Sequence, residues 1–324
     1  MKGKDLKNSI LQMAVQGKLV PQDPDDEPAS VLLERIREER RRLIAEGKLK
    51  APKGGESVIY RASDGSHYEK RIDAKGHVLS DECIEDEIPF EIPESWEWVR
   101  LRDLADFAGG KTPSTSDKSN YEDNGILWVT SKDMKRDFID STLITLSKKG
   151  ASDLTLFKPG TILMVARSGI LRRMLPVAML KEAATINQDQ KAICPFDVSV
   201  SLWLLVYLKA SDIRIRRGCS KAGTTVESIV FGKVKTLLVP IPPLAEQRHI
   251  AERVSELVSL VEEYGKLGAE REALDTALPD RLRKSILQQA VQGRLAPQDP
   301  ADEPASVLLG RIREERRRLI AEGR

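Results

Sequence analysis

The segment PQDPDDEPASVLLERIREERRRLIAEG at residues 21–47 returns almost unchanged as PQDPADEPASVLLGRIREERRRLIAEG at residues 297–323. The match also extends upstream. Residues 6–48 align with residues 282–324 at a constant offset of 276, with 35 identities in 43 positions. Identity this high over this length indicates a duplication within the chain. The 324-residue sequence therefore holds two copies of one segment, with unrelated sequence between them.

Each copy is expected to form two helices. In the first helix the apolar residues recur at helical spacing, and the glycine that typically ends a helix follows at Gly17 and again at Gly293. Prolines at positions 21, 24 and 28 predict a turn, because three prolines so close together cannot lie inside one helix. A second helix is predicted from about Pro28 to Ala45.

The second helix of the first copy is rich in arginine. Glutamates lie three or four residues from most of its arginines, a pattern typical of a salt-bridged, solvated helix face. A basic arm for DNA is the first alternative, and a protein-binding surface is the second. The paired charges favour the solvated face.

Composition limits the class of protein. The chain is 40% hydrophobic and 31% charged, which suits a protein with long solvated helices. The sequence shows no apolar run near the roughly 18–20 residues of a membrane span and no apolar signal core at the start. Its three isolated cysteines favour a reducing compartment, without disulfides or a zinc site. We therefore expect a cytoplasmic protein.

Residues 90–240 predict a compact α+β domain. Short strand-like runs alternate with turns, and the apolar stretch SLWLLVYLKAS at residues 201–211 predicts a buried helix. This segment holds 22 Lys and Arg against 17 Asp and Glu, a net charge of +5, whereas residues 51–89 and 241–281 are each net −4. The basic charge is therefore concentrated in the middle of the chain, although weakly.

A long helix is predicted after this domain. Apolar residues from Ile250 to Tyr264 are spaced by 4, 3, 4 and 3, which is a coiled-coil seam that Gly265 and Gly268 interrupt. The simplest partner is the repeat helix that begins at Leu282. The predicted order is an N-terminal helical repeat (1–48), a polar linker with a short hairpin around 58–60 and 68–72 (49–89), the globular domain (90–240), a coiled-coil spacer helix (241–281) and a C-terminal helical repeat (282–324).

The sequence contains fragments of catalytic motifs, but the other residues that those motifs require are missing at the necessary spacing. GGKTPS at residues 109–114 resembles the end of a Walker A loop, but Ala105 stands where that pattern needs glycine, and Pro113 disfavours the helix that should follow. The three histidines have no partner at metal-ligand or catalytic spacing. Ser168 lacks the flanking glycines of a nucleophile elbow. No catalytic residue, metal ligand or cofactor of its own is predicted, so this chain is not expected to be an enzyme by itself.

Basic and amide-bearing loops of residues 90–240 are the remaining candidates for binding. Lys and Arg suit DNA phosphates, Arg also suits guanine edges, and Asn and Gln suit adenine edges. Ordinary surface loops carry the same residue types, so each loop alone is a weak signal. The candidate DNA-binding residues are Lys111, Thr112, Ser114, Lys132, Arg167, Ser168, Arg172, Arg173, Asn187, Gln188, Lys191, Arg217, Lys221 and Thr224.

Several stretches, in their order along the chain, resemble the specificity subunit of type I restriction-modification enzymes. They are the repeat SILQMAVQGKLVPQDPDDEPASVLLERIREER, IPFEIPESWEWVRLRDL (88–104), GGKTPSTSDKSNYEDNGILWVTSKDM (109–134), LFKPGTILMVARSG (156–169), TINQDQKAICP (185–195) and VPIPPLAEQRHIAERV (239–254). The resemblance implies an α+β fold, with a globular target recognition domain and long helices that form an antiparallel coiled coil.

The resemblance also implies a function. Members of that family read double-stranded DNA and leave the chemistry to partners: two adenine-methylating modification subunits dock on them, and a restriction subunit can join. S-adenosylmethionine and ATP would be bound by those partners. Two recognition domains in each full-length member read the two halves of an interrupted site.

Only one recognition domain is found here, so the chain resembles a half-length specificity subunit. Two chains joined by their helices would then read a palindromic, interrupted site. A scaffold that no longer reads DNA, a truncated fragment of a two-domain subunit and a stand-alone enzyme are the alternatives.

Overall fold

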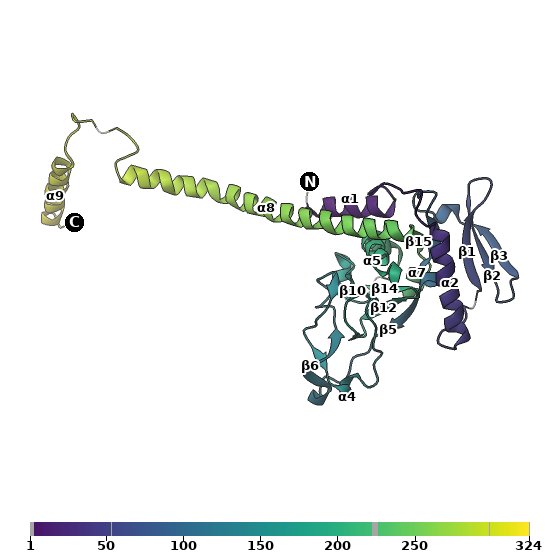
Figure 1. The fold of residues 1–324 in the computed structure, drawn as a ribbon. Helices are drawn as coiled ribbons and strands as arrows, with labels where there is room; N and C mark the ends of the chain where they lie inside the picture. Colours follow the sequence, from purple (N-terminus) through teal and green to yellow (C-terminus); the bar gives the residue numbers. More distant parts are fainter. Residues whose placement is uncertain (1–2, 53, 222–225, 298, 324) are drawn as a thin grey trace. The chain divides into compact units, whose positions relative to one another are not determined.

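The computed structural model describes residues 3–52, 54–221, 226–297 and 299–323 (Figure 1). The chain divides into two compact units, residues 1–262 and residues 263–324. One helix, α8 (Leu244–Val291), contributes to both units. Within the described ranges, no helix is both long and apolar enough to cross a membrane.

Two mixed sheets form the centre of the first unit, as the predicted α+β class requires. The larger sheet has the order β5 (Ala105–Gly109), β12 (Gln190–Pro195), β9 (Ile162–Val165), β10 (Val177–Leu180) and β7 (Phe138–Ile139). The smaller sheet has the order β11 (Ala184–Ile186), β6 (Tyr121–Val129) and β8 (Thr145–Leu146). The shorter elements are η1 (Glu85–Glu87), α3 (Leu101–Leu104), η2 (Lys118–Asn120), α4 (Lys148–Ala151), η3 (Gly169–Arg172), η4 (Val198–Val200), β13 (Ser220–Lys221), β14 (Ser228–Ile229) and α7 (Phe231–Lys235).

Strand β9 is apolar throughout because both of its faces are covered. Ile162 and Met164 belong to a core shared with α5 (Ser201–Ala210), whereas Leu163 and Val165 belong to a core shared with β6 and β11. A strand buried on both faces reads as a continuous apolar run rather than as an alternating one. The sequence GTILMVA therefore predicted this strand correctly.

The buried helix α5 connects the domain to the two strands that bound it. Trp203 Nε1 donates to the carbonyl of Pro240 at 2.7 Å, and the Tyr207 hydroxyl donates to the carbonyl of Leu238 at 2.6 Å. Both acceptors lie in β15 (Leu238–Ile241), which pairs antiparallel with β4 (Glu97–Arg100). The predicted helices at 201–211 and 211–217 are confirmed as α5 and α6 (Asp212–Gly218).

The segment that sequence analysis treats as a polar linker contains a sheet of three strands. The expected hairpin is confirmed as β1 (Glu56–Arg61) and β2 (His67–Ile72), and β3 (Val78–Cys83) adds a strand that was not expected. Buried Glu69 of β2 holds this sheet to the domain, because it accepts a hydrogen bond from Arg100 of β4 at 2.7 Å. Within the sheet it also accepts one from Ser57 of β1 at 2.6 Å. Burial alone would raise the pKa of Glu69, but these bonds and the Arg100 charge lower it.

The first repeat packs against the globular domain through α1 (Gly3–Val15) and α2 (Ala29–Ala45). The left-handed Gly17, with φ of 68°, ends α1, and a Cβ there would lie 2.4 Å from the Pro93 ring. Buried Glu246 of α8 accepts from Trp96 Nε1 at 2.8 Å and from Gln22 at 2.6 Å. One carboxylate therefore joins the repeat, the start of the domain and α8.

Ion pairs neutralise the arginines of α2, as the sequence predicted. Arg37 and Arg41 pair with Glu34 and Glu56, and Arg42 pairs with Glu39 at 2.6 Å. Arg40 differs, because it is buried and its Nη1 lies 2.7 Å from Asp103 Oδ1. Burial raises the pKa of Asp103, and the Arg40 charge acts in the opposite direction.

One expectation about the spacer helix is wrong. Gly265 and Gly268 do not interrupt it, and α8 continues through Leu282 to Val291. Leu282 therefore lies within the same helix and cannot start its partner. The antiparallel partner is α1 instead: Lys7 lies 3.4 Å from Glu262, whereas Gln22, beyond the end of α1, reaches Glu246 at the start of α8. Figure 1 shows α1 beside the first part of α8.

We expect Arg40→Leu to lower the free energy of unfolding by about 3–5 kcal/mol at pH 7, since it leaves the buried Asp103 carboxylate without its cation. Arg42→Leu is the matched control, because it removes an arginine from the same helix but breaks only an exposed ion pair, so its loss of stability should be much smaller. Urea denaturation measures both. Equal losses would contradict the role of the buried pair.

The Arg40→Leu loss should also depend on pH. Asp103 is expected to keep a raised pKa in the folded variant, so the penalty is full above that pKa and shrinks as pH falls through it, because protonation removes the buried charge.

Candidate nucleic-acid interface

Strands β6 and β11 are parallel, and this places two predicted loops at one edge. Leu127 pairs with Ala184 and Val129 pairs with Ile186, so both strands end at the same side of the sheet. Lys132 lies in the turn that follows β6, and Asn187 and Gln188 follow β11. The backbone N–H of Asn187 donates to the carbonyl of Val129 at 3.0 Å. The Lys132 turn and the amide loop are therefore neighbours.

The glycine-rich loop joins the same edge. The backbone N–H of Lys111 donates to the carbonyl of Ile186 at 3.1 Å. A Cβ on Gly110 would lie 2.2 Å from the carbonyl oxygens of both Ile186 and Asn187, so this approach requires glycine. Lys111, Thr112 and Ser114 are all exposed. The motif that resembles a Walker A loop thus presents a lysine and two hydroxyl residues beside Asn187.

The arginine loop meets the other end of the amide loop. The backbone N–H groups of Ala166 and Arg167 both donate to the carbonyl of Asp189, at 2.8 and 3.2 Å. Arg167 also forms a bridge with Ser228, which pairs with Lys221 in the β13–β14 ribbon. Arg167 and Lys221 are exposed. Five predicted segments, those of Lys132, Asn187, Lys111, Arg167 and Lys221, therefore follow one another along a continuous edge.

Charge distinguishes these loops from the arginine-rich helix. Arg172 is 4.0 Å from Glu227, at the limit for an ion pair. Among the described residues, no carboxylate lies within 4.0 Å of the other predicted basic side chains, which are Lys111, Lys132, Arg167, Arg173, Lys191, Arg217 and Lys221. Exposed cations without acidic neighbours attract a polyanion, because no internal pair competes for them.

Some predicted residues have a structural role or lie elsewhere. The Ser168 hydroxyl accepts from the backbone N–H of Ile170 at 3.4 Å and so caps the turn η3. Lys191 pairs with Gly109 within the sheet and is only half-exposed. Arg217 lies in the last turn of α6. Thr224 lies outside the described residues.

Two further residues of the candidate loops, Arg216 and Gln190, were not among the predicted DNA-binding residues. Arg216 binds Asp212 at 2.6 Å and the carbonyl of Arg172 at 3.4 Å, which holds the arginine loop against α6. Gln190 is fully buried, and neither of its side-chain amide atoms has a hydrogen-bond partner among the described residues. The Oδ1 atom of Asn187 is also buried and has no partner among them. Buried amides without partners are uncommon in proteins. The amide-rich string TINQDQK was the signal for both amides.

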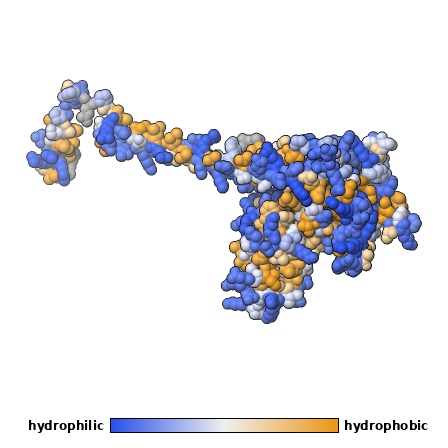
Figure 2. All heavy atoms as spheres, viewed as in Figure 1, coloured by the Kyte–Doolittle hydropathy of each residue, from blue (hydrophilic) through white to orange (hydrophobic). Residues whose placement is uncertain are grey.

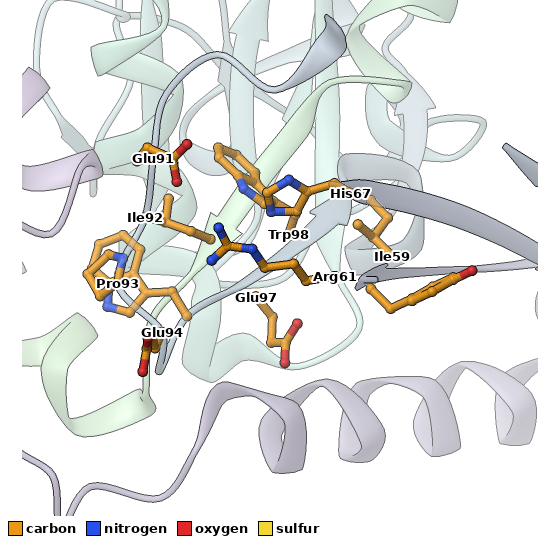
Figure 3. Close-up of a pocket in the computed structure, with 11 residues that line it drawn as sticks. Ile59, Arg61, His67, Glu91, Ile92, Pro93, Glu94, Glu97 and Trp98 are labelled. Carbon is orange, nitrogen blue, oxygen red and sulfur yellow. The ribbon is translucent and has the colours of Figure 1, made fainter. Parts of the chain in front are cut away.

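A hollow of about 370 Å³ lies elsewhere in the first unit (Figure 3). Residues of β1, β2 and the segment 91–98 line it, among them Arg61, Glu97 and Trp98. Burial raises the pKa of Glu97. No residue of the basic loops lines this hollow. The described part of the chain contains no cluster of three or more His, Cys, Asp or Glu side chains suited to a metal ion.

Comparisons with known proteins match the whole domain. A family model described as the type I restriction modification DNA specificity domain covers residues 93–267. The specificity subunit of the type I restriction enzyme EcoAI from Escherichia coli is 28% identical over 99% of this chain, and that of EcoEI from the same organism is 27% identical over 99%. The chain spans 57% and 56% of the lengths of these two relatives.

A chain of a solved type I R-M system also matches, with a TM-score of 0.49 and 23% identity over 82% of this chain and 58% of its own length. The family model spans more than half of the sequence, including the two sheets, the basic loops and the start of α8. This chain therefore belongs to the family of type I restriction-modification specificity subunits.

Proposed function

We propose that this chain reads DNA through the edge formed by its basic and amide-bearing loops. The observation that supports this most strongly is the contrast between its two groups of arginines. Those of α2 are paired with carboxylates, whereas Arg167, Arg173 and Arg217 have no carboxylate within 4.0 Å among the described residues. Of these, Arg167 lies beside the amide loop, because its backbone N–H donates to the carbonyl of Asp189, and the amide loop can contact bases.

The proposed contacts divide by chemistry. Lys111, Lys132 and Lys221 suit phosphate oxygens, which fix the position of the protein on the duplex. Exposed Gln188 suits the paired donor and acceptor of an adenine edge, whereas Asn187, whose Oδ1 is buried, can offer only its Nδ2 donor to a base. Arg167 suits a guanine edge. Phosphate contacts supply affinity that falls steeply with salt, whereas base contacts supply specificity.

The partners proposed for this chain carry out the catalysis. We propose that modification subunits dock on it and methylate adenine within its site, and that a restriction subunit can join the complex. S-adenosylmethionine and ATP would then be bound by those subunits. Such a complex must reach chromosomal DNA, so we place it in the cytoplasm.

Self-association is part of the proposal. One recognition domain reads one half of an interrupted site, so two chains related by a two-fold axis would read a palindromic site. An assembly scaffold without sequence reading is the second candidate. It would keep the helices and the partners but would not depend on the basic loops.

We expect Arg167→Ala and Asn187→Ala to affect DNA binding differently. Loss of a base-edge contact at Asn187 should cost about 1–3 kcal/mol on the cognate site and relax one position of it. Arg167→Ala should likewise relax one position, that of its guanine, and leave the salt slope nearly unchanged. Equal weakening on all sequences with a salt slope lower by about one would instead indicate a phosphate contact. Fluorescence anisotropy on cognate and scrambled duplexes at several salt concentrations measures both.

Arg41→Ala is the matched control, since it removes an arginine that is already paired with Glu34 and Glu56. Its DNA affinity should stay within about twofold of the wild type. If Arg41→Ala weakens binding as much as Arg167→Ala, the arginine-rich helix is the contact and the loop assignment is wrong.

We expect methylome sequencing of cells that express this chain with its modification partner to show one bipartite adenine motif that is lost without the chain. Alanine variants at Asn187 and Lys221 should alter or abolish that motif. An unchanged motif in both variants would favour the scaffold. Methyl transfer by the purified chain alone would contradict the assignment of catalysis to partners.

A further inference from the structure

The second copy of the repeat preserves the contact face of the first. Nine residues of the first copy are buried: Ile10, Leu11, Ala14, Val15, Ala29, Leu32, Leu33, Ile36 and Arg40. Each has an identical residue 276 positions later. The eight positions at which the copies differ are 7, 8, 13, 18, 20, 25, 34 and 48, and none of them is buried in the first copy. The differences are therefore confined to positions that packing does not restrict.

The same face is exposed in the described residues of the second copy. Leu308, Leu309 and Ile312 are 51%, 50% and 53% exposed, whereas their counterparts Leu32, Leu33 and Ile36 are at most 4% exposed. The local fold is the same, because α9 (Ala305–Ala321) has the 17 residues of α2, and Gly293 has a φ of 67° where Gly17 has 68°. Apolar side chains gather along α9 and the described part of α8 beyond residue 262 (Figure 2).

We propose that residues 282–323 dock on the globular unit of a second copy of this chain, at the surface that residues 6–47 cover in their own chain. The docked copy displaces the first copy from that surface. Arg316 then takes the place of Arg40 beside Asp103, and Ile312 takes the place of Ile36. The inference rests on the proposed self-association and adds to it the two surfaces and the helix register.

The register follows from α1. This helix runs antiparallel to α8, with Lys7 beside Glu262. Arg283 is the counterpart of Lys7, so it would lie beside Glu262 of the second copy. The two α8 helices are then antiparallel, and their two-fold axis passes between residues 272 and 273. Two-fold symmetry requires each α8 to present the same surface on both sides of that axis.

An exposed stripe on α8 has this symmetry. Its apolar members are Leu260, Tyr264, Leu267, Leu274, Leu278, Leu282 and Ile286, all at least 45% exposed, and Arg271 continues the same helical face. Leu267 and Leu278 lie at equal distances from the axis between residues 272 and 273. Across the same axis, Tyr264 lies within one residue of the position opposite Leu282 of the second copy. Leu260 lies within one residue of the position opposite Ile286. The stripe was not used to derive the axis, so the agreement is independent support.

Disulfide trapping tests the register. Leu267→Cys and Leu278→Cys chains with different tags are co-expressed in a Cys83→Ser background, which removes the exposed native thiol. We expect a disulfide between the two kinds of chain and little within either kind. In a pair of Leu267→Cys chains the two introduced thiols would be 11 residues out of register, about 16 Å along the helix, too far for a disulfide. A disulfide of equal yield between two Leu267→Cys chains, or no disulfide in a dimeric sample, would overturn the register.

Sedimentation velocity on the full chain tests the docking face. Ile312→Asp should raise the dimer dissociation constant at least about tenfold, since it puts a carboxylate into an apolar contact, whereas its exposure in one chain leaves folding intact. Val307→Asp is the control: Val31, its counterpart, is 42% exposed on the docked first copy, so this variant should dimerise normally.

The outcomes separate the proposals. A wild-type chain that is a monomer at all concentrations overturns both self-association and the docking. A dimer that Ile312→Asp leaves intact overturns only the docking. Neither result changes the anisotropy test of the basic loops, so DNA reading stands or falls separately.

Discussion

The buried carboxylate of Glu246 is the contact on which the arrangement of the first unit depends. It accepts from Trp96, where the recognition domain begins, and from Gln22, in the turn of the repeat, while its own backbone starts α8. Burial raises the pKa of Glu246, and both hydrogen bonds act to lower it. Three segments separated by up to 224 residues meet at this side chain. One carboxylate therefore holds the start of α8 to the globular domain and to the first repeat.

The candidate loops need a rigid support if their side chains are to read base edges. Reading base edges requires side chains held to within a fraction of an ångström, and loops achieve this only when their ends are fixed. Here the amide loop is held by backbone hydrogen bonds to Val129 at one side and to Ala166 and Arg167 at the other. The glycine at position 110 lets the neighbouring loop approach without a side chain between them. The candidate base-contacting side chains thus lie on an ordered sheet edge.

Arginine serves three different purposes in this chain. In α2 it forms exposed ion pairs with glutamates that keep a helix soluble. At Arg40 and Arg100 it compensates buried carboxylates, which fixes packing. In the loops around Asn187 it has, apart from Arg172 at the 4.0 Å limit from Glu227, no carboxylate partner among the described residues, and there its charge is available to a ligand. A count of arginines along the sequence would have favoured α2, whose arginines are already paired with carboxylates.

Local sequence was sufficient for the elements whose signal is local. Periodicity, prolines and glycines predicted the two repeat helices, the buried helix α5, the strands β9, β10 and β12 and the hairpin around 58–60 and 68–72. The candidate loops could be named from residue type alone. The adjacency of the loops could not be predicted in this way, because the Lys132 turn meets Asn187 only through the parallel pairing of β6 with β11, strands about 60 residues apart.

The tertiary structure also decided that Glu69 of the apparent linker is buried against Arg100, and that α8 passes through two glycines to end at Val291. Duplication itself could be read from the sequence. The sequence could not show in which copy the apolar helix face is buried, because burial depends on what packs against a helix and not on the helix alone.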